Sequence, residues 1–113
     1  MTKPRRFRKD EAVDRNQVIG ALRAHEQEPR AAGVVSMSLF GSTARGENPC
    51  RDVDVAVRLD ETFSRPGLDY IGHLNDLERR LSEILGCKVD VTEEPVRKQR
   101  FQREIDRDRA VAF

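Results

Sequence analysis

The sequence predicts one small domain of the mixed α+β class, in which helices flank a short β-sheet. Two apolar segments with strand-like alternation, residues 34–40 and 52–59, lie close together in the first half of the chain. Residues 70–85 repeat their leucines and isoleucines at helical spacing, and a third apolar strand follows over residues 88–92. The chain has 113 residues, the usual length of one domain with a modest core.

The amino-terminal part divides into an extension and a helix. Residues 1–13 are polar and basic, which indicates a flexible extension, so that the folded domain comprises residues 14–113. Asp14 and Gln17 have the spacing of a capping box, and an apolar stripe at helical spacing follows them. We expect this first helix to fade near Pro29 because proline interrupts a helix interior.

The first strand, residues 34–40, alternates apolar residues with serines. Side chains along a strand point to opposite faces in turn. The alternation therefore predicts that Val35, Met37 and Leu39 share one face of the sheet, and that the serines share the other.

A Gly-Ser turn follows this strand at Gly41 and Ser42. The next residues, through Arg45, fit a short helix that Gly46 ends. The second strand then runs over residues 52–59, where valines alternate with other residues.

The carboxyl-terminal half begins with the long amphipathic helix of residues 70–85. Gly86 is placed to end this helix in a left-handed conformation. The third strand covers residues 88–92, and Thr92 is expected to open a last, charged helix. Residues 110–113 are expected to add a short edge strand.

The charge balance argues against several functional classes. Lys and Arg number 21 and Asp and Glu number 20, so the net charge makes direct binding to nucleic acid or to an anionic membrane unlikely. The cations are nevertheless grouped, in a basic head over residues 3–9 and in a second cluster of Arg97, Lys98, Arg100 and Arg103.

The apolar runs are too short to span a bilayer and no signal-peptide pattern is present, so we expect a cytoplasmic protein without membrane contact. The two cysteines, Cys50 and Cys87, form neither a disulfide framework nor a zinc-ligand spacing. We therefore expect two free thiols, as is usual in the cytoplasm.

Two aspartates mark the second strand as chemically unusual. Asp52 and Asp54 are one residue apart, so both project from the same face while the valines project from the other. Two carboxylates on a half-buried face repel each other and lose solvation, which calls for a compensating cation. Mg²⁺ suits this position because it binds oxygen ligands and bridges them to substrate phosphates.

The Gly-Ser turn beside this strand is suited to hold phosphates. Gly41 lets the backbone approach a ligand closely because it has no Cβ. Ser42 can donate its hydroxyl and its backbone N–H to a phosphate oxygen. Arg45, one turn later, could approach the same phosphates.

Asp90 stands in the third strand, which should lie beside the second. The side chain of Asp90 would then be a third carboxylate on the same surface as Asp52 and Asp54. Three carboxylates can hold two Mg²⁺ ions for in-line phosphoryl transfer. In this arrangement one metal sits on the nucleotide phosphates, and Asp90 takes the proton of the attacking hydroxyl. Each piece alone is commonly surface polarity or an ordinary turn, but the joint pattern favours a metal site.

At this point the chain resembles a known family. Residues 39–46 (LFGSTARG), residues 52–54 (DVD) and residues 88–91 (KVDV) are similar to the minimal nucleotidyltransferases of the DNA polymerase β superfamily. The resemblance implies a polymerase β-like mixed sheet flanked by helices, which binds Mg²⁺-ATP and transfers a nucleotidyl group with release of pyrophosphate. It also implies that Gly41 and Ser42 hold phosphate, and that the metal ligands are Asp52, Asp54 and Asp90.

The resemblance further implies a protein partner. Relatives of this size are commonly antitoxins paired with a HEPN-domain ribonuclease toxin, which they inactivate by adenylylating a tyrosine. A hetero-oligomer in which the partner presents the nucleophile is then expected, because this chain is too short to include an acceptor domain.

Two alternatives stay open. Arg51 stands where many relatives carry a serine, which favours a binding module of the same fold that neutralises its partner by contact, with weak or absent transfer. A small nucleic-acid-binding domain that uses the basic head and the last helix is less favoured, because the net charge is near zero and aromatic residues are few.

Overall fold

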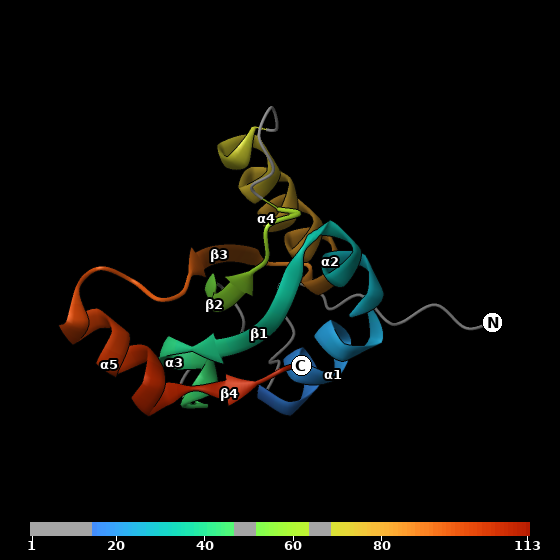
Figure 1. Cartoon of the computed structure of the whole chain (residues 1–113). Coiled ribbons are helices and arrows are strands. Elements are labelled where there is room, and N and C mark those ends of the chain that lie inside the picture. Colours follow the sequence, from blue (N-terminus) through green and yellow to red (C-terminus); the bar gives the residue numbers. More distant parts are fainter. Residues whose placement is uncertain (1–14, 47–51, 64–68) are drawn as a thin grey trace.

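The computed structural model describes residues 15–46, 52–63 and 69–113. The predicted extension, the Asp14 cap and Arg51 lie outside these residues. Within these described ranges, nine elements follow one another (Figure 1). They are α1 (Arg15–Ala24), α2 (Gln27–Ala32), β1 (Val34–Phe40), α3 (Gly41–Ala44), β2 (Asp52–Leu59), α4 (Tyr70–Leu85), β3 (Lys88–Glu93), α5 (Gln99–Asp108) and β4 (Ala110–Val111).

The strands form one mixed sheet in the order β3-β2-β1-β4. β1 pairs antiparallel with both β2 and β4, whereas β2 and β3 run parallel. The long helix α4 makes the crossover that a parallel pair requires. The predicted mixed sheet flanked by helices is therefore confirmed, and the short last strand lies at its edge.

One face of the sheet carries the main core. The valines of β2 and β3 alternate inward and meet apolar residues of α1 and α4. Burial of this continuous apolar layer is the chief stabilising term. Its fully buried members include Val18, Leu22, Met37, Leu39, Val53, Val55, Val57, Phe63, Leu81 and Leu85.

The opposite face carries a smaller cluster that seats α5. Ile105 of α5 is fully buried against Phe40 of β1 and Ala56 of β2. Phe101 packs edge to face on Phe40, with ring centroids 5.8 Å apart. The last helix is thus docked on the same face as Asp54, since that residue and Ala56 are two apart on one strand.

In the first strand, the prediction for the face on which Val35 lies is wrong. The register between β1 and β2 shifts between Val34 and Ser36, which marks a bulge. Val34 is buried and Val35 is 48% exposed, so Val35 does not share the face of Met37 and Leu39. The alternation holds only after the bulge.

Pro29 does not end the first helix as expected. The chain leaves α1 after Ala24 and re-enters helix at Gln27, so that Pro29 lies buried in the first turn of α2. A first-turn proline is tolerated because its missing N–H would have no helical partner. Gly33, with φ of 112°, ends α2.

The last helix begins later than predicted. Thr92 is not its cap, because β3 continues through Glu93 and the N–H of Glu94 donates to the Val57 carbonyl at 2.8 Å. α5 begins only at Gln99. The predicted end of α4 is confirmed, since Gly86 has φ of 73°.

Two further findings concern the helices and the cysteines. Within the described ranges, every helix is too short or too polar to cross a membrane. Cys87 is disulfide-bonded, so the expectation of two free thiols is wrong; Cys50 lies outside the described residues. The spacing of cysteines along the sequence does not show how close a cysteine sulfur lies to another in the folded chain. Because disulfides are rare in cytosolic proteins, this bond runs against a cytoplasmic location.

Candidate functional site

The register of the parallel strands brings the predicted carboxylates together. Asp54 of β2 is the direct partner of Asp90 of β3, and Asp52 precedes Asp54 by two residues on the same face. Lys88 is the partner of Asp52 and lies on that face too. Three acids and one lysine from two neighbouring strands therefore share one surface of the sheet.

The pKa of Asp54 reports the crowding of these acids. Burial raises it most, and the charges of Asp90 and Asp52 raise it further, while Arg45 lowers it. Asp54 is half-buried, so water screens the repulsion only in part. The ionised carboxylates therefore destabilise one another, and a cation between them would relieve that repulsion.

Gly41 joins the turn to these acids. It has a φ of 75°, and a Cβ built on it would lie 2.6 Å from Oδ2 of Asp54. No side chain fits between the turn and this carboxylate, so a glycine is required on both conformational and steric grounds. Ser42 follows in the single turn of α3 and is half-buried. The predicted phosphate turn thus lies against the predicted metal ligands.

The side chain of Arg45 is bound by a residue of another element, α5. Its Nη1 donates to Oδ2 of Asp108 in α5 at 2.6 Å. Asp108 also accepts from Nε of Arg107, and its side chain is only 7% exposed. The charge of Arg45 lowers the pKa of Asp54, against the larger effects that raise it. Asp108 was not among the predicted residues, because nothing local in the sequence links α5 to the turn.

A second polar network on this face was also missed. Glu94, whose side chain is 1% exposed, accepts hydrogen bonds from both terminal nitrogens of Arg109 and from Gln102 at 2.8 Å. Arg109 also donates to Oγ of Ser38 in β1 at 3.1 Å. The guanidinium holds the pKa of Glu94 below its usual value. This network fixes α5 and β4 to the strands that carry the acids.

The fit of these residues to a metal can be judged from their chemistry. In the described part of the chain, no three His, Cys, Asp or Glu side chains are gathered tightly enough to hold a metal ion as they stand. Mg²⁺ does not need such a cage, because it usually binds one or two carboxylates and completes its shell with waters and substrate phosphates. Asp52, Asp54 and Asp90 offer oxygen ligands of that kind beside the turn.

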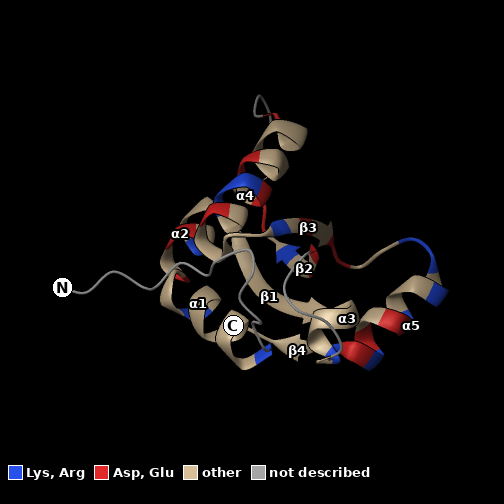
Figure 2. Cartoon of the chain, turned by 180° about the vertical axis from the view of Figure 1, so that it is seen from behind, with Lys and Arg blue, Asp and Glu red and all other residues tan. Residues whose placement is uncertain are grey.

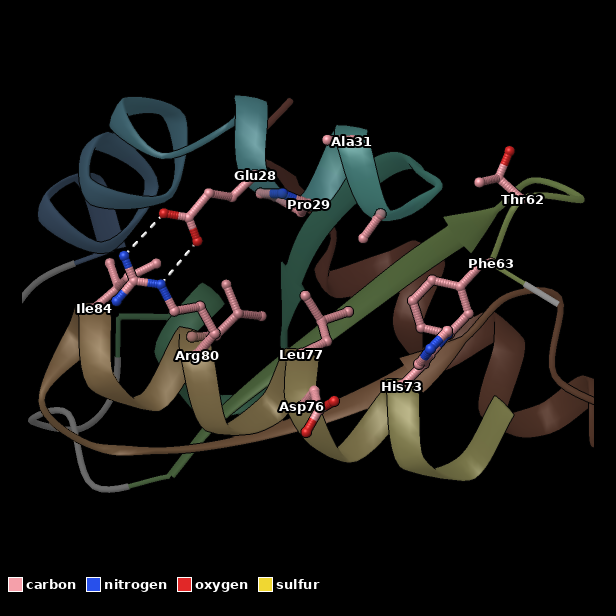
Figure 3. Close-up of a pocket in the computed structure, with 12 residues that line it drawn as sticks. Glu28, Pro29, Ala31, Thr62, Phe63, His73, Asp76, Leu77, Arg80 and Ile84 are labelled. Carbon is pink, nitrogen blue, oxygen red and sulfur yellow. Dashed lines mark hydrogen bonds and ion pairs between the residues drawn. The ribbon is translucent and has the colours of Figure 1, made fainter. Parts of the chain in front are cut away.

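A cavity of about 390 Å³ lies elsewhere, between α2 and α4 (Figure 3). Phe63, Leu77 and Leu81 line it, and all three belong to the main core on the other face of the sheet. Its cation Arg80 is already bound by Glu28 through two hydrogen bonds of 2.8 and 2.9 Å. The cavity is therefore unsuited to a triphosphate.

Comparisons with known proteins agree with the fold. Residues 16–112 match the family model described as nucleotidyltransferase domain. A solved chain named as a minimal nucleotidyltransferase matches with a TM-score of 0.67 at 24% identity, over 87% of this chain and 95% of that one. A toxin-antitoxin structure with AMP-PNP matches with a TM-score of 0.60 at 20% identity, over 89% and 73% of the two chains. The toxin-antitoxin MntA-HpeT, in a mutant form, gives 0.57 at 18% identity over the same shares.

No protein of curated function matches the chain. The solved structures are all below 25% identical, so they show a shared fold and nothing finer. The fold predicted from the resemblance is confirmed by these matches and by the mixed sheet itself.

Proposed function

Because the chain belongs to the nucleotidyltransferase domain family, we propose that it transfers a nucleotidyl group, AMP from ATP, to a protein partner with the help of Mg²⁺. The observation that supports this most directly is the position of Asp54. It is paired in register with Asp90 and is in reach of Gly41, so acid ligands and a phosphate turn adjoin.

The chain's own residues would divide the work as follows. Gly41 and Ser42 seat the triphosphate, with Arg45 nearby. Asp52 and Asp54 would hold a magnesium ion, and Asp90 would help to hold a second. Bound Mg²⁺ would supply positive charge against the phosphates and acidify the acceptor hydroxyl.

In the proposed transfer, one bond forms for each bond that breaks, and a side chain of the protein accepts the proton. The acceptor oxygen forms a bond to the α-phosphorus, and the bond from that phosphorus to the bridging oxygen of pyrophosphate breaks. Asp90 takes the acceptor's proton as a general base. Lys88, opposite Asp52, adds positive charge to the face on which charge develops.

The partner is proposed from the structural neighbours. Two of them are toxin-antitoxin structures, and one of these contains AMP-PNP. We propose that this chain is the antitoxin of such a pair, that it forms a hetero-oligomer with a HEPN-type ribonuclease toxin, and that it modifies that toxin. We propose the cytoplasm as the compartment because the transfer requires ATP and magnesium, although a disulfide such as that of Cys87 is more usual in oxidising compartments.

Titration calorimetry with Mg²⁺-ATP tests the site. The wild type should bind, and Asp54→Asn should lose at least about tenfold in affinity, since it removes a metal ligand. Asp76→Asn is the matched control, because Asp76 is an exposed aspartate on α4 whose side chain is 61% accessible. Equal heats from wild type and Asp54→Asn would contradict the assignment.

A second function shares the fold but not the reaction. The chain could neutralise its partner by contact alone, and Arg51, a cation directly before the aspartate pair in the sequence, favours this alternative. Incubating the purified pair with α-labelled ATP separates the two. Label on the partner supports transfer, whereas a stable complex without label supports contact alone.

A further inference from the structure

Ion pairs hold the arginines on several surfaces of the molecule. Examples are Arg30–Glu26, Arg45–Asp108, Arg79–Asp76, Arg80–Glu28 and Arg109–Glu94. One group of cations differs from these, because its members are exposed and make no ion pair with any described residue. This group, the α5 basic surface, consists of Arg97, Lys98, Arg100 and Arg103 (Figure 2).

The position of the α5 basic surface is unfavourable for the helix that carries it. α5 begins at Gln99, and its first turn contains no acidic residue. The Lys98 side chain makes no capping hydrogen bond. The amino end of a helix carries partial positive charge, so cations there are repelled rather than stabilised. The helix dipole therefore gives no reason for cations at the start of α5.

The surface is also presented rigidly. Phe101 packs on Phe40, Ile105 is fully buried, and Arg109 binds the buried Glu94. The helix thus cannot turn its cations away toward other acids of the chain. A preorganised set of charges loses less entropy on binding than a loose tail does.

We propose that the α5 basic surface docks on an acidic surface of the protein partner. The inference rests on the proposed function only for the existence of such a partner, and not for the transfer reaction. Three of the four cations are arginines, whose planar forks pair with carboxylates through two hydrogen bonds.

A protein fits this surface better than a nucleic acid. Phe101, the aromatic residue among these cations, is partly buried and packs edge to face on Phe40, which limits its use as a stacking surface for a base. The whole chain carries a formal charge of only +1, so it lacks the broad positive field that attracts a phosphate backbone.

The docking site would lie at a useful distance from the carboxylates. The other end of α5 contacts the turn through Asp108 and Arg45. Phe101 in the first turn of α5 packs on Phe40, the residue before Gly41, so a partner held at this turn also stands near the proposed phosphate turn. An acceptor side chain on that partner could then reach the acids.

Nuclear magnetic resonance without nucleotide tests the docking surface. ¹⁵N-labelled protein is titrated with a hexaglutamate peptide at about 50 mM salt, and amide shifts are expected to concentrate on residues 97–103. Arg100→Gln with Arg103→Gln should weaken binding about tenfold, by two lost ion pairs. The matched control, Arg79→Gln with Arg107→Gln, removes the same charge from two exposed arginines and should retain the affinity.

The outcomes separate this proposal from the transfer reaction. No nucleotide is present, so the result is the same whether or not the chain transfers AMP. Shifts elsewhere, or equal losses in both double variants, overturn the proposal. A 20-nucleotide polyuridine RNA that binds residues 97–103 about tenfold tighter than the peptide at about 150 mM salt also overturns it, in favour of nucleic acid. Thermal melting should show the Arg100/Arg103 variant at least as stable as wild type, because it relieves repulsion at the helix start.

Discussion

Gly41 and Asp54 adjoin at the corner between β1 and β2, so closely that a Cβ on the glycine would lie 2.6 Å from the carboxylate oxygen Oδ2. The strands β1 and β2 are antiparallel, and Phe40, the last residue of β1 before the glycine, is the register partner of Asp54. The sheet therefore holds Gly41 and Asp54 side by side, as the proposed phosphate and metal site requires.

Gly41→Ala is expected to disable the site more than it destabilises the fold. The methyl group must displace the Asp54 carboxylate, so affinity for Mg²⁺-ATP should fall about tenfold or more in calorimetry. Gly46→Ala is the control, because Gly46 has φ of 71° and a Cβ there would meet no atom of the described residues within 4 Å beyond its chain neighbours. Both variants should lose about 1 kcal/mol of stability from the left-handed backbone. Equal binding losses in the two would mean that strain, and not the contact with Asp54, is responsible.

Asp54→Asn is expected to stabilise the free protein at neutral pH. The pKa of Asp54 is raised above 3.8, so the folded chain binds this proton more tightly than the unfolded chain. Wild-type stability therefore falls as pH rises from 3.8 through the folded pKa, and the penalty is complete above it. The stability difference between variant and wild type should be near zero below pH 3.8 and largest at about pH 7. Denaturant unfolding across pH measures it, and a variant less stable than wild type at neutral pH would contradict it.

Arg109→Ala should be strongly destabilising because it leaves Glu94 buried without its cation. Removing one partner of a buried pair costs about 3 kcal/mol, measured as a shift in urea unfolding. The exposed pair of Arg79 and Asp76 is the comparison, and Arg79→Ala should cost less than about 1 kcal/mol.

The Glu94–Arg109 pair also has a pH signature. The pKa of Glu94 is lowered from 4.5, so its stabilisation is present above that value and is lost as pH falls through the folded pKa. Arg109→Ala should therefore lose most of this acid sensitivity. An unchanged pH profile would show that the pair contributes little.

The hydroxyl of Tyr70 should ionise only at an unusually high pH. Burial, followed by the hydrogen bond its hydroxyl donates to Glu93, raises the pKa of Tyr70 to about 12. It is the only tyrosine and the chain has no tryptophan, so ultraviolet absorbance reports this group alone. Glu93→Gln should lower the pKa but leave it above 10, since burial is the larger cause. In urea the value should return to about 10, and stability should fall as pH rises from about 10 to about 12.

Local patterns predicted the main elements at the bounds observed. Residues 34–40, 52–59 and 70–85 each combine a clear period with glycine, proline or aspartate at their ends. Where a signal was ambiguous the prediction erred: a bulge turned Val35 outward, and Thr92 remained in the sheet instead of capping a helix. These outcomes depend on pairing with β2, which no single segment encodes.

Some parts of the candidate site could likewise be predicted from the sequence, and others could not. The common face of Asp52 and Asp54 follows from the strand period, and their proximity to Asp90 follows once the two strands are neighbours. The ion pair of Arg45 with Asp108 joins residues 63 positions apart, and local sequence gives no sign of it. The polar supports of the site are thus visible only in the folded chain.

The crowded acids on β2 and β3 have a consequence for the lifetime of the protein in a cell. A chain that keeps mutually repelling charges is less robust when empty, and any molecule that binds only its folded form protects it by mass action. With the proposed substrate scarce, more of the protein would open and meet proteases. Its abundance would then rise and fall with the energy state of the cell, without any change in its synthesis.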